Sequence, residues 1–147
     1  MSSNPGSQNQ AAVEQRINEL VQQSRVYEAY INDVMTKQMT VSRLLEEARL
    51  ASTTIQSTSP ETEVESLMPI GIGIHMKAMV PAVKKLVVSL GAGVAIEKSR
   101  DDALNYVESR IKEYELAARQ LEAQRNDLAM RMQQLQNQVN QLLRTAQ

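Results

Sequence analysis

The sequence contains no cysteine, no phenylalanine and no tryptophan, and four tyrosines are its only large aromatic residues. The absence of cysteine excludes a disulfide framework and zinc–thiolate sites, and it agrees with a cytoplasmic location. Because bulky core side chains come only from Leu, Ile, Val and Met, we do not expect a compact globular core, although 42% of the 147 residues are hydrophobic. Gln, Glu, Arg, Ala and Leu dominate outside the middle of the chain, as is typical of long helices or coiled coils.

A strong net charge and long apolar runs are also missing. The formal net charge is −1, so no long-range field favours binding to nucleic acid or to an anionic membrane. No apolar stretch approaches the ~20 residues that span a bilayer, and the chain does not open with the basic start and apolar run of a secretory signal. Residues 1–12 carry no charged side chain and almost no large apolar one, which predicts a disordered tail on a soluble protein.

Glycine and proline are absent from residues 13–57 and 99–147 and are concentrated in residues 64–98. In that stretch apolar side chains alternate with others around two Gly-x-Gly sequences. The alternating apolar residues are Met68, Ile70, Ile72, Ile74 and Met76, followed by Leu86, Val88, Leu90, Ala92, Val94 and Ile96. Period-two alternation interrupted by Gly-x-Gly is typical of hairpins with tight turns. Residues 64–98 are therefore predicted to form two β-hairpins.

A heptad pattern begins at Val13. Alternating steps of four and three residues give thirteen positions, ten of them apolar: Val13, Ile17, Leu20, Ser24, Tyr27, Ile31, Val34, Gln38, Val41, Leu45, Ala48, Ser52 and Ile55. A seam sustained over about six heptads predicts a coiled-coil helix over residues 13–57. Hydroxyl side chains and Pro60 follow, and they predict a polar linker over residues 58–63.

A second helix is predicted over residues 99–145. Ser99 and Asp102 resemble a capping box, and Asp101 adds a second acidic residue to the first turn. The seam positions are Leu104, Val107, Ile111, Tyr114, Ala118, Leu121, Arg125, Leu128, Met132, Leu135, Val139 and Leu142, all apolar except Arg125. This seam is similar in length to the first.

Two seams of similar length around a compact insert predict a mainly helical α+β chain, in which a long antiparallel two-helix coiled coil carries the hairpins at its bend. Folding back the second helix places Val13 near Leu142 and Ile31 near Arg125. Two interpretations of the polar seam residues stay open: they fix the register, or they are tolerated imperfections. These residues are Ser24, Gln38, Ser52 and Arg125.

The two predicted hairpins carry more alternating apolar side chains than two helices can cover. Isolated two-stranded hairpins are not independently stable, and open sheet edges invite pairing with other chains. We therefore expect residues 64–98 to complete a sheet or an intersubunit β-barrel in an oligomer.

No residue is predicted to be catalytic, cofactor-binding or metal-ligating. His75 is the only histidine and has no cysteine or clustered carboxylates near it in the sequence, so a solvent-facing strand position is the preferred interpretation. The Gly-x-Gly pairs lack the spacing of phosphate-binding loops and are better explained as turns. Lys84 and Lys85 are too few for a nucleic-acid footprint. The chain is not expected to be an enzyme.

The two helix ends carry apolar residues both on and off the seams, among them Val21, Met130 and Leu143. At the tip of a two-helix coil no third element covers such side chains fully. Flexible apolar side chains suit weak, sequence-tolerant contact with apolar segments. The alternative is a frayed coil end without function.

Parts of the middle and of the second helix closely resemble prefoldin α-class subunits. The matching stretches are ESLMPIGIG at 65–73, LVVSLGAGVAIEKS at 86–99, and the helix from DAL at 102–104 to RIKEYE at 110–115. The architecture resembles that family from about Ala11 to Leu143, and two hairpins distinguish the α class from β-class subunits, which carry one.

The resemblance implies an archaeal-type hexamer of two α and four β subunits in the cytoplasm. Its hairpins would form a double β-barrel body from which the coiled coils project. It would act without ATP as a holdase that captures unfolded proteins at the coil tips and delivers them to a group II chaperonin. Residues implied to build the body are Leu67, Ile70, Ile72, Ile74, Val88, Leu90, Val94 and Ile96. Residues expected to contact clients are Val13, Ile17, Leu20, Val21, Leu135, Val139, Leu142 and Leu143.

Two other classes of function remain as alternatives. A structural or adaptor coiled coil would recruit one defined partner with saturable affinity and would not suppress aggregation. A nucleic-acid-binding coil is disfavoured by the near-neutral charge and would show tight, salt-dependent binding.

Overall fold

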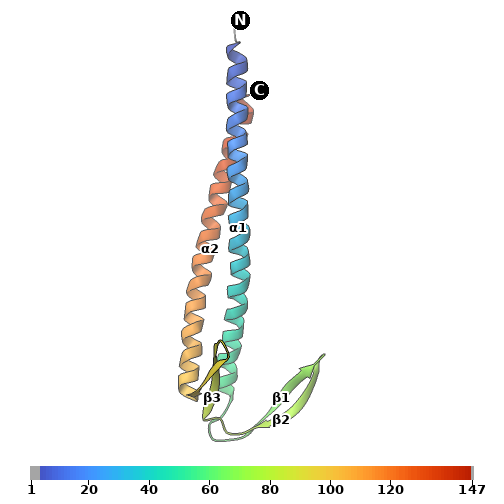
Figure 1. The fold of residues 1–147 in the computed structure, drawn as a ribbon, viewed down its shortest axis with the longest axis vertical. Coiled ribbons are helices and arrows are strands. Elements are labelled where there is room, and N and C mark those ends of the chain that lie inside the picture. Colours follow the sequence, from blue (N-terminus) through green and yellow to red (C-terminus); the bar gives the residue numbers. More distant parts are fainter. Residues whose placement is uncertain (1–3, 147) are drawn as a thin grey trace. The chain divides into compact units, whose positions relative to one another are not determined.

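The computed structural model describes residues 4–146 of the chain. These residues belong to two compact units, which we call the coil unit (described residues 4–41 with 117–146) and the hairpin unit (Ser42–Leu116). In chain order the elements are α1 (Pro5–Ser57), β1 (Val64–Gly71), β2 (Ile74–Val80), β3 (Lys85–Gly91), β4 (Val94–Ser99) and α2 (Arg100–Thr145) (Figure 1). The predicted mainly helical chain with two long helices and two hairpins is confirmed.

Helix α1 begins at Pro5, eight residues before the predicted start. The predicted disorder of residues 1–12 is therefore wrong for residues 5–12, and residues 1–3 lie outside the described residues. Proline suits the first helical position because its φ is already helical and its missing N–H would have no helical partner there. The Ser7 amide and hydroxyl both donate to the Asn4 carbonyl oxygen, at 3.0 and 2.8 Å. Lack of charge was thus a poor sign of disorder.

The junctions around the hairpins follow the predicted chemistry. At the end of α1, Ser57 Oγ donates to the Thr54 carbonyl and Thr58 Oγ1 to the Ile55 carbonyl, at 2.8 and 2.6 Å. At the start of α2, the Asp102 amide donates to Ser99 Oγ at 3.1 Å. Ser99 is thus the predicted N-cap, which satisfies an amide that has no partner within the helix.

The two hairpins repeat one design. Strands β1 and β2 form one antiparallel pair and β3 and β4 form another, with no ladder joining the two sheets among the described residues. Each pair has a register shift just before its turn. In both turns the central three residues have positive φ, from Gly71 to Gly73 and from Gly91 to Gly93. Glycine tolerates this conformation without steric cost, which explains the spacing of the glycines.

The helices run antiparallel within each unit. In the coil unit, Leu20 shares a cavity with Leu142, whereas Val34, further along α1, shares one with Leu128, which comes earlier in α2. In the hairpin unit, Arg49 of α1 forms an ion pair with Glu115 of α2 at 3.3 Å.

The predicted register is wrong by a few residues. Leu142 of α2 shares its cavity with Arg16 and Leu20 of α1. Its neighbours therefore come later in α1 than Val13, the predicted neighbour. The exact offset between the two helices is decided by side-chain packing, which a seam pattern with a seven-residue period leaves free.

The Arg100 side chain connects the end of α1 to the start of α2. Its Nη2 atom lies 3.0 Å from the Ile55 carbonyl oxygen, 3.2 Å from that of Thr58 and 3.4 Å from that of Gln56. Its backbone amide donates to the Lys84 carbonyl at 3.2 Å. Helix α1 has no basic residue in its own last turn, so Arg100 supplies the positive charge that the carbonyl end of a helix favours. One side chain therefore joins the end of α1 to the start of α2.

Replacing Arg100 by Met should lower the free energy of unfolding by about 1.5–3 kcal/mol, since charge-assisted hydrogen bonds to carbonyls with no other helical partner are lost. Arg49→Met is the matched control, because it removes an exposed ion pair whose loss should cost about 1 kcal/mol or less. Urea unfolding followed by circular dichroism measures both. Equal effects of the two substitutions would show that Arg100 does not hold the junction.

Candidate functional site

The coil unit buries a narrow stripe of side chains. Every predicted seam position of α1 is buried or half-buried, and the same holds for α2 except at Arg125, which is exposed. Leu20 is only 1% exposed, Val34 5% and Leu135 8%. The heptad pattern thus identified the interhelical core. A two-helix coil leaves the rest of each helix open to solvent.

The eight predicted client contacts fall into three groups. Leu20 and Leu135 are buried between the helices, so in the folded coil they serve as core and have little surface to offer a client. Val13, Ile17, Val139 and Leu142 are half-buried. Val21 and Leu143 lie beside the seam and are 37% and 49% exposed. Only this last pair presents a large free apolar surface.

Several exposed apolar side chains of the coil unit were not in the predicted set. They are Val26, Tyr30, Met35, Met39 and Met130. The signal that identifies them is the same one that identified Val21, namely a large apolar residue outside the seam of an otherwise polar helix. A single exposed apolar residue is common on protein surfaces. Because several occur along this coil, they extend the candidate binding surface beyond the predicted residues.

The end of α2 carries no charge over a long segment. Residues 132–143 contain no Asp, Glu, Lys or Arg, and Arg131 and Arg144 flank them. Amide side chains fill the outer positions and pair along the helix: Gln133 donates to Asn137 and Gln136 to Asn140, at 3.2 and 3.1 Å. The surface there is thus composed of amides and aliphatic groups.

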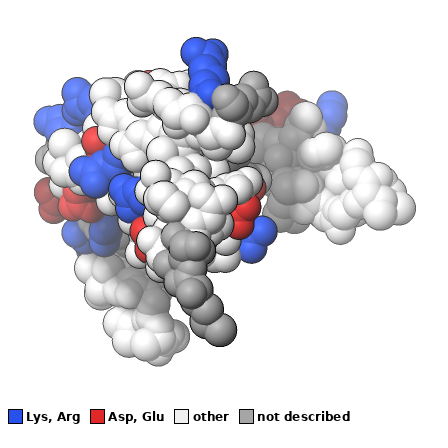
Figure 2. Space-filling model, turned by 90° about the horizontal axis from the view of Figure 1, so that it is seen from above, with Lys and Arg blue, Asp and Glu red and all other residues white. Residues whose placement is uncertain are grey.

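The uncharged segment has a charged boundary. Arg131 Nε donates to Asp127 Oδ2 at 3.0 Å. The Tyr27 side chain, and after it the Asp127 carboxylate, raise the pKa of the Arg131 guanidinium further above its ordinary value. Arg131 therefore stays cationic at any physiological pH. Over the face that Figure 2 shows, charges of both signs are interspersed without a field of one sign.

The first hairpin leaves an apolar face uncovered. Met68 and Met76 pair directly across β1 and β2 and are about half exposed, as are Ile70 and Ile74. Leu67 pairs with Lys77 instead, so by alternation it lies on the other face, where Lys77 Nζ lies 3.7 Å from Glu65 Oε1. Of the predicted assembly residues, Ile70 and Ile74 therefore share the apolar face with the two methionines, and Leu67 does not.

The second hairpin is partly covered by the helices. Val88 is half-buried, whereas Leu90, Val94 and Ile96 are exposed. Lys98 Nζ lies 5.1 Å from the centre of the Tyr106 ring, on which Arg110 also packs at 5.4 Å. The contact between Lys98 and Tyr106 joins β4 to α2, whereas that between Arg110 and Tyr106 lies within α2.

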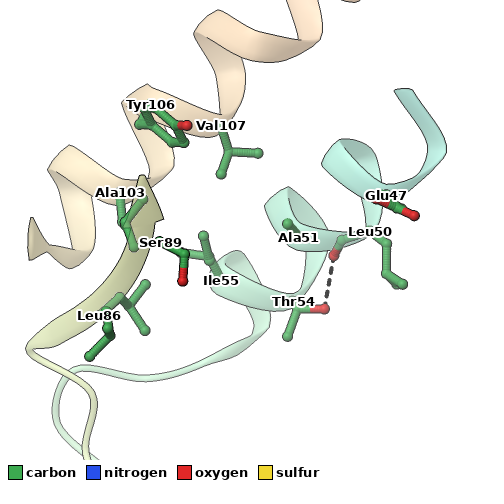
Figure 3. A pocket seen from close by; sticks show the side chains of 12 residues that line it. Glu47, Leu50, Ala51, Thr54, Ile55, Leu86, Ser89, Ala103, Tyr106 and Val107 are labelled. Atoms are coloured by element: carbon green, nitrogen blue, oxygen red, sulfur yellow. Dashed lines mark hydrogen bonds between the residues drawn. The ribbon is translucent and has the colours of Figure 1, made fainter. Parts of the chain in front are cut away.

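An open apolar groove of about 580 Å³ lies between α1, β3 and α2 within the hairpin unit (Figure 3). Leu50, Ile55, Leu86, Val88, Ala103 and Val107 contribute its apolar walls. Glu47 is the one charged side chain that lines it in the described part of the chain. The groove has the size and character of a binding site for several apolar side chains.

The described residues do not gather into a chemical site. No group of three or more His, Asp or Glu side chains among residues 4–146 is placed to hold a metal ion. His75 is exposed, with Nδ1 at 3.2 Å from the Gly73 carbonyl oxygen. No helix in this same range is both long enough and apolar enough to cross a membrane. The candidate sites are accordingly two surfaces, the coil ends and the hairpins with their groove.

Two helices joined through paired hairpins define a class of coiled-coil assembly subunits, and comparison with known families identifies which one. The family model described as prefoldin subunit matches residues 27–145. The chain is 36% identical over 134 residues to prefoldin subunit alpha of Nitrosopumilus maritimus, covering 91% of this chain and 92% of the relative. The chain belongs to the prefoldin family of chaperones.

Further relatives and solved structures agree with this assignment. Over 54 residues the chain is 50% identical to prefoldin subunit alpha 1 of Thermococcus kodakarensis, covering 37% of each. The filamentous PFD of Methanocaldococcus jannaschii matches with a TM-score of 0.63 and 25% identity, over 82% of this chain and 98% of that one. The prefoldin beta subunit of Thermococcus strain KS-1 has the same fold, with a TM-score of 0.62 at 18% identity over 87% and 92%.

The division between core and surface at the coil ends predicts a contrast between neighbouring residues. Leu20→Ala should lower the free energy of unfolding by about 2–5 kcal/mol, because it empties a buried position. Val21→Ala, one residue along the same helix, should change it by about 0.5 kcal/mol or less. Thermal and urea unfolding measure both changes. Comparable losses would show that the helix is rotated from the orientation described.

Proposed function

We propose that the chain is the α-class subunit of a hetero-oligomeric prefoldin that holds unfolded proteins without ATP. The observation that carries the proposal is the uncharged end of α2, residues 132–143, where aliphatic side chains are half-buried or exposed beside a stable interhelical core. Such a surface offers apolar contact without charge selection, which suits segments of many unrelated unfolded chains. Family membership supports this function.

Within the proposal the coil ends bind the client. The contact set is Val13, Ile17, Val21, Val139, Leu142 and Leu143, joined by Met130, whereas Leu20 and Leu135 maintain the coil beneath it. Each contact is small and the side chains keep rotamer freedom, so binding is weak per residue and depends on several contacts at once.

The hairpins are proposed to form the assembly. Their exposed apolar faces would be covered by β-class subunits, in a hexamer of two α and four β chains with an intersubunit β-barrel. Closure of a barrel removes the open sheet edges that both two-stranded sheets now carry. Delivery of the client to a group II chaperonin in the cytoplasm completes the proposed pathway.

The first test removes most of the proposed client site, leaving Met130 in place, and retains the assembly. Deleting residues 1–23 and 137–147 cuts both helices near the level at which Leu20 and Leu142 share a cavity. Light scattering follows a denatured model protein that is diluted into buffer with the full or the shortened complex. The full complex should suppress aggregation and the shortened hexamer should not. If an intact full hexamer fails to suppress it, an adaptor function that recruits one partner takes precedence.

A second test uses two leucines of similar exposure. Leu143 in the coil unit and Leu116 in the hairpin unit are 49% and 52% exposed. Val21→Ser combined with Leu143→Ser should weaken client binding roughly five- to tenfold, the effect of losing about 1–1.4 kcal/mol of apolar contact. Leu116→Ser should leave it unchanged. The affinity is measured by fluorescence anisotropy of a labelled unfolded client. Equal loss in both variants would place the client surface elsewhere.

Delivery is tested separately from capture. Adding a group II chaperonin and ATP to a preformed complex with client should restore native client activity, whereas ATP alone should not. Recovery with ATP alone would contradict the ATP-independent mechanism.

A further inference from the structure

Three cavities of the coil unit follow one another along the two helices. Their volumes are about 370, 360 and 340 Å³. The first and second share Tyr27 and Arg131 among their lining residues, and the second and third share Gln138. Neighbouring cavities therefore border on one another and form one groove, which we call the coil groove and which extends along α2 from Gln124 to Thr145.

The residues at the edges of the coil groove recur at multiples of seven along each helix. They are Arg16, Tyr30 and Lys37 on α1 and Gln124, Arg131 and Gln138 on α2. Each of them directly precedes a seam position, so all six lie on the same side of the coil. Val21 and Leu143 instead directly follow seam leucines, which places them on the other side. The coil groove is thus a surface separate from this exposed apolar pair.

The coil groove has an apolar floor, and the cations at its edges are neutralised. Buried and half-buried seam residues form the floor, namely Leu20, Val34, Leu128, Leu135 and Leu142. Each cationic side chain at the edges forms an ion pair with a carboxylate of its own helix. The pairs, at N–O distances of 3.2, 2.9 and 3.0 Å, are Arg16–Glu19, Lys37–Asp33 and Arg131–Asp127. Because these charges are already paired, the groove favours an uncharged occupant.

Four glutamine side chains supply hydrogen-bonding groups along the coil groove. They are Gln124, Gln134, Gln138 and Gln141, and all four are exposed. None of them belongs to the two amide–amide pairs of α2. An amide side chain can both donate and accept, which matches the N–H and C=O groups that an extended polypeptide presents along its length. A helical occupant has already paired these groups within itself and would leave the glutamines without partners.

We propose that the coil groove binds an extended, uncharged segment of an unfolded client, with its glutamines hydrogen-bonded to the main chain of the client. From Gln124 to Thr145, α2 rises about 30 Å, the length of about nine extended residues. Leu142 and Met130, two proposed client contacts, line the groove. Main-chain groups are the same in every protein, so this contact adds affinity without selecting a sequence. The inference rests on the proposed holdase function and assigns a recognition mode to it.

A fluorophore in the coil groove reports binding at this surface alone. The chain has no cysteine, so Thr145→Cys, at an exposed groove position, carries an environment-sensitive fluorophore in a complex with a cysteine-free β-class prefoldin subunit. The ligand is a nine-residue peptide of alternating valine and threonine. The same peptide with N-methyl groups on alternate residues keeps its side chains and loses half its main-chain donors. It should bind about tenfold more weakly, and equal affinity of the two peptides would refute main-chain recognition.

A substitution experiment separates hydrogen bonding from apolar contact by the sign of its effect. Gln134→Met combined with Gln138→Met keeps side-chain length and helix propensity but removes both amides. Affinity for the unmethylated peptide should fall about five- to tenfold, although the groove becomes more apolar. Unchanged or tighter binding would show that the groove acts through apolar contact only. The matched control is Gln15→Met with Gln22→Met, at exposed positions that face away from the seam, and it should leave the affinity unchanged.

A helical occupant is tested with a second kind of ligand. A side-chain-stapled, uncharged helical peptide with leucine at every seventh position offers apolar side chains at the spacing of the groove and no free main-chain groups. It should bind more weakly than the extended peptide in the same fluorescence titration. Tighter binding of the stapled helix would contradict the proposal, since the groove would then be a docking site for a third helix.

The outcome is separable from the proposed holdase function. If the wild-type complex suppresses aggregation but the glutamine substitutions leave peptide affinity unchanged, main-chain recognition in the groove is wrong and the holdase function stands. If the peptide binds in the groove and the substitutions weaken it, but the wild-type complex does not suppress aggregation, the holdase function is wrong and the groove remains a site for extended peptides.

Discussion

The mutual burial of two narrow apolar seams is the constraint on which the remainder of this structure depends. A two-helix coil covers only one stripe of each helix, here marked by Leu20, Val34 and Leu135. It therefore holds the helices together while leaving most of their surface in water. The same geometry that stabilises the coil also keeps Val21 and Leu143 accessible at its end. A third packed layer would have stabilised the chain and removed its candidate binding surface.

The junction between helices and hairpins solves a different problem. Where a long helix ends, its last carbonyl groups have no partner within the helix. The hydroxyl groups of Ser57 and Thr58 donate hydrogen bonds to carbonyl groups in the last turn of α1, which lies directly before them in sequence. Arg100 donates to the same turn from the start of α2. A cation at a helix start is unfavourable for the dipole of α2, and Asp101 and Asp102 in the same turn offset it. The return of the chain is thus fixed by polar contacts, and the coil by apolar ones.

The hairpins and the coil ends are both apolar surfaces, but they differ in order and in backbone restraint. Strand pairing fixes Met68 opposite Met76 and holds Ile72 at a set position, which suits a defined partner surface. The coil ends carry flexible aliphatic and amide side chains without charge over residues 132–143, which suits many partners. Under the proposed function, one chain would combine a specific surface for assembly with a permissive one for capture.

The sequence by itself determined the helices, the hairpins, the N-cap at Ser99 and the seam, because heptad spacing, period-two alternation and capping chemistry are local properties that neighbouring residues decide. It did not reveal the helix start at Pro5, since absence of charge does not prevent a helix from forming. Only the tertiary structure decided which apolar residue of a pair such as Leu20 and Val21 is core and which is surface, how far the two helices are offset, and that Arg100 caps a helix forty-five residues before it. These properties depend on the packing of segments distant in sequence, and a seven-residue period allows more than one register between them.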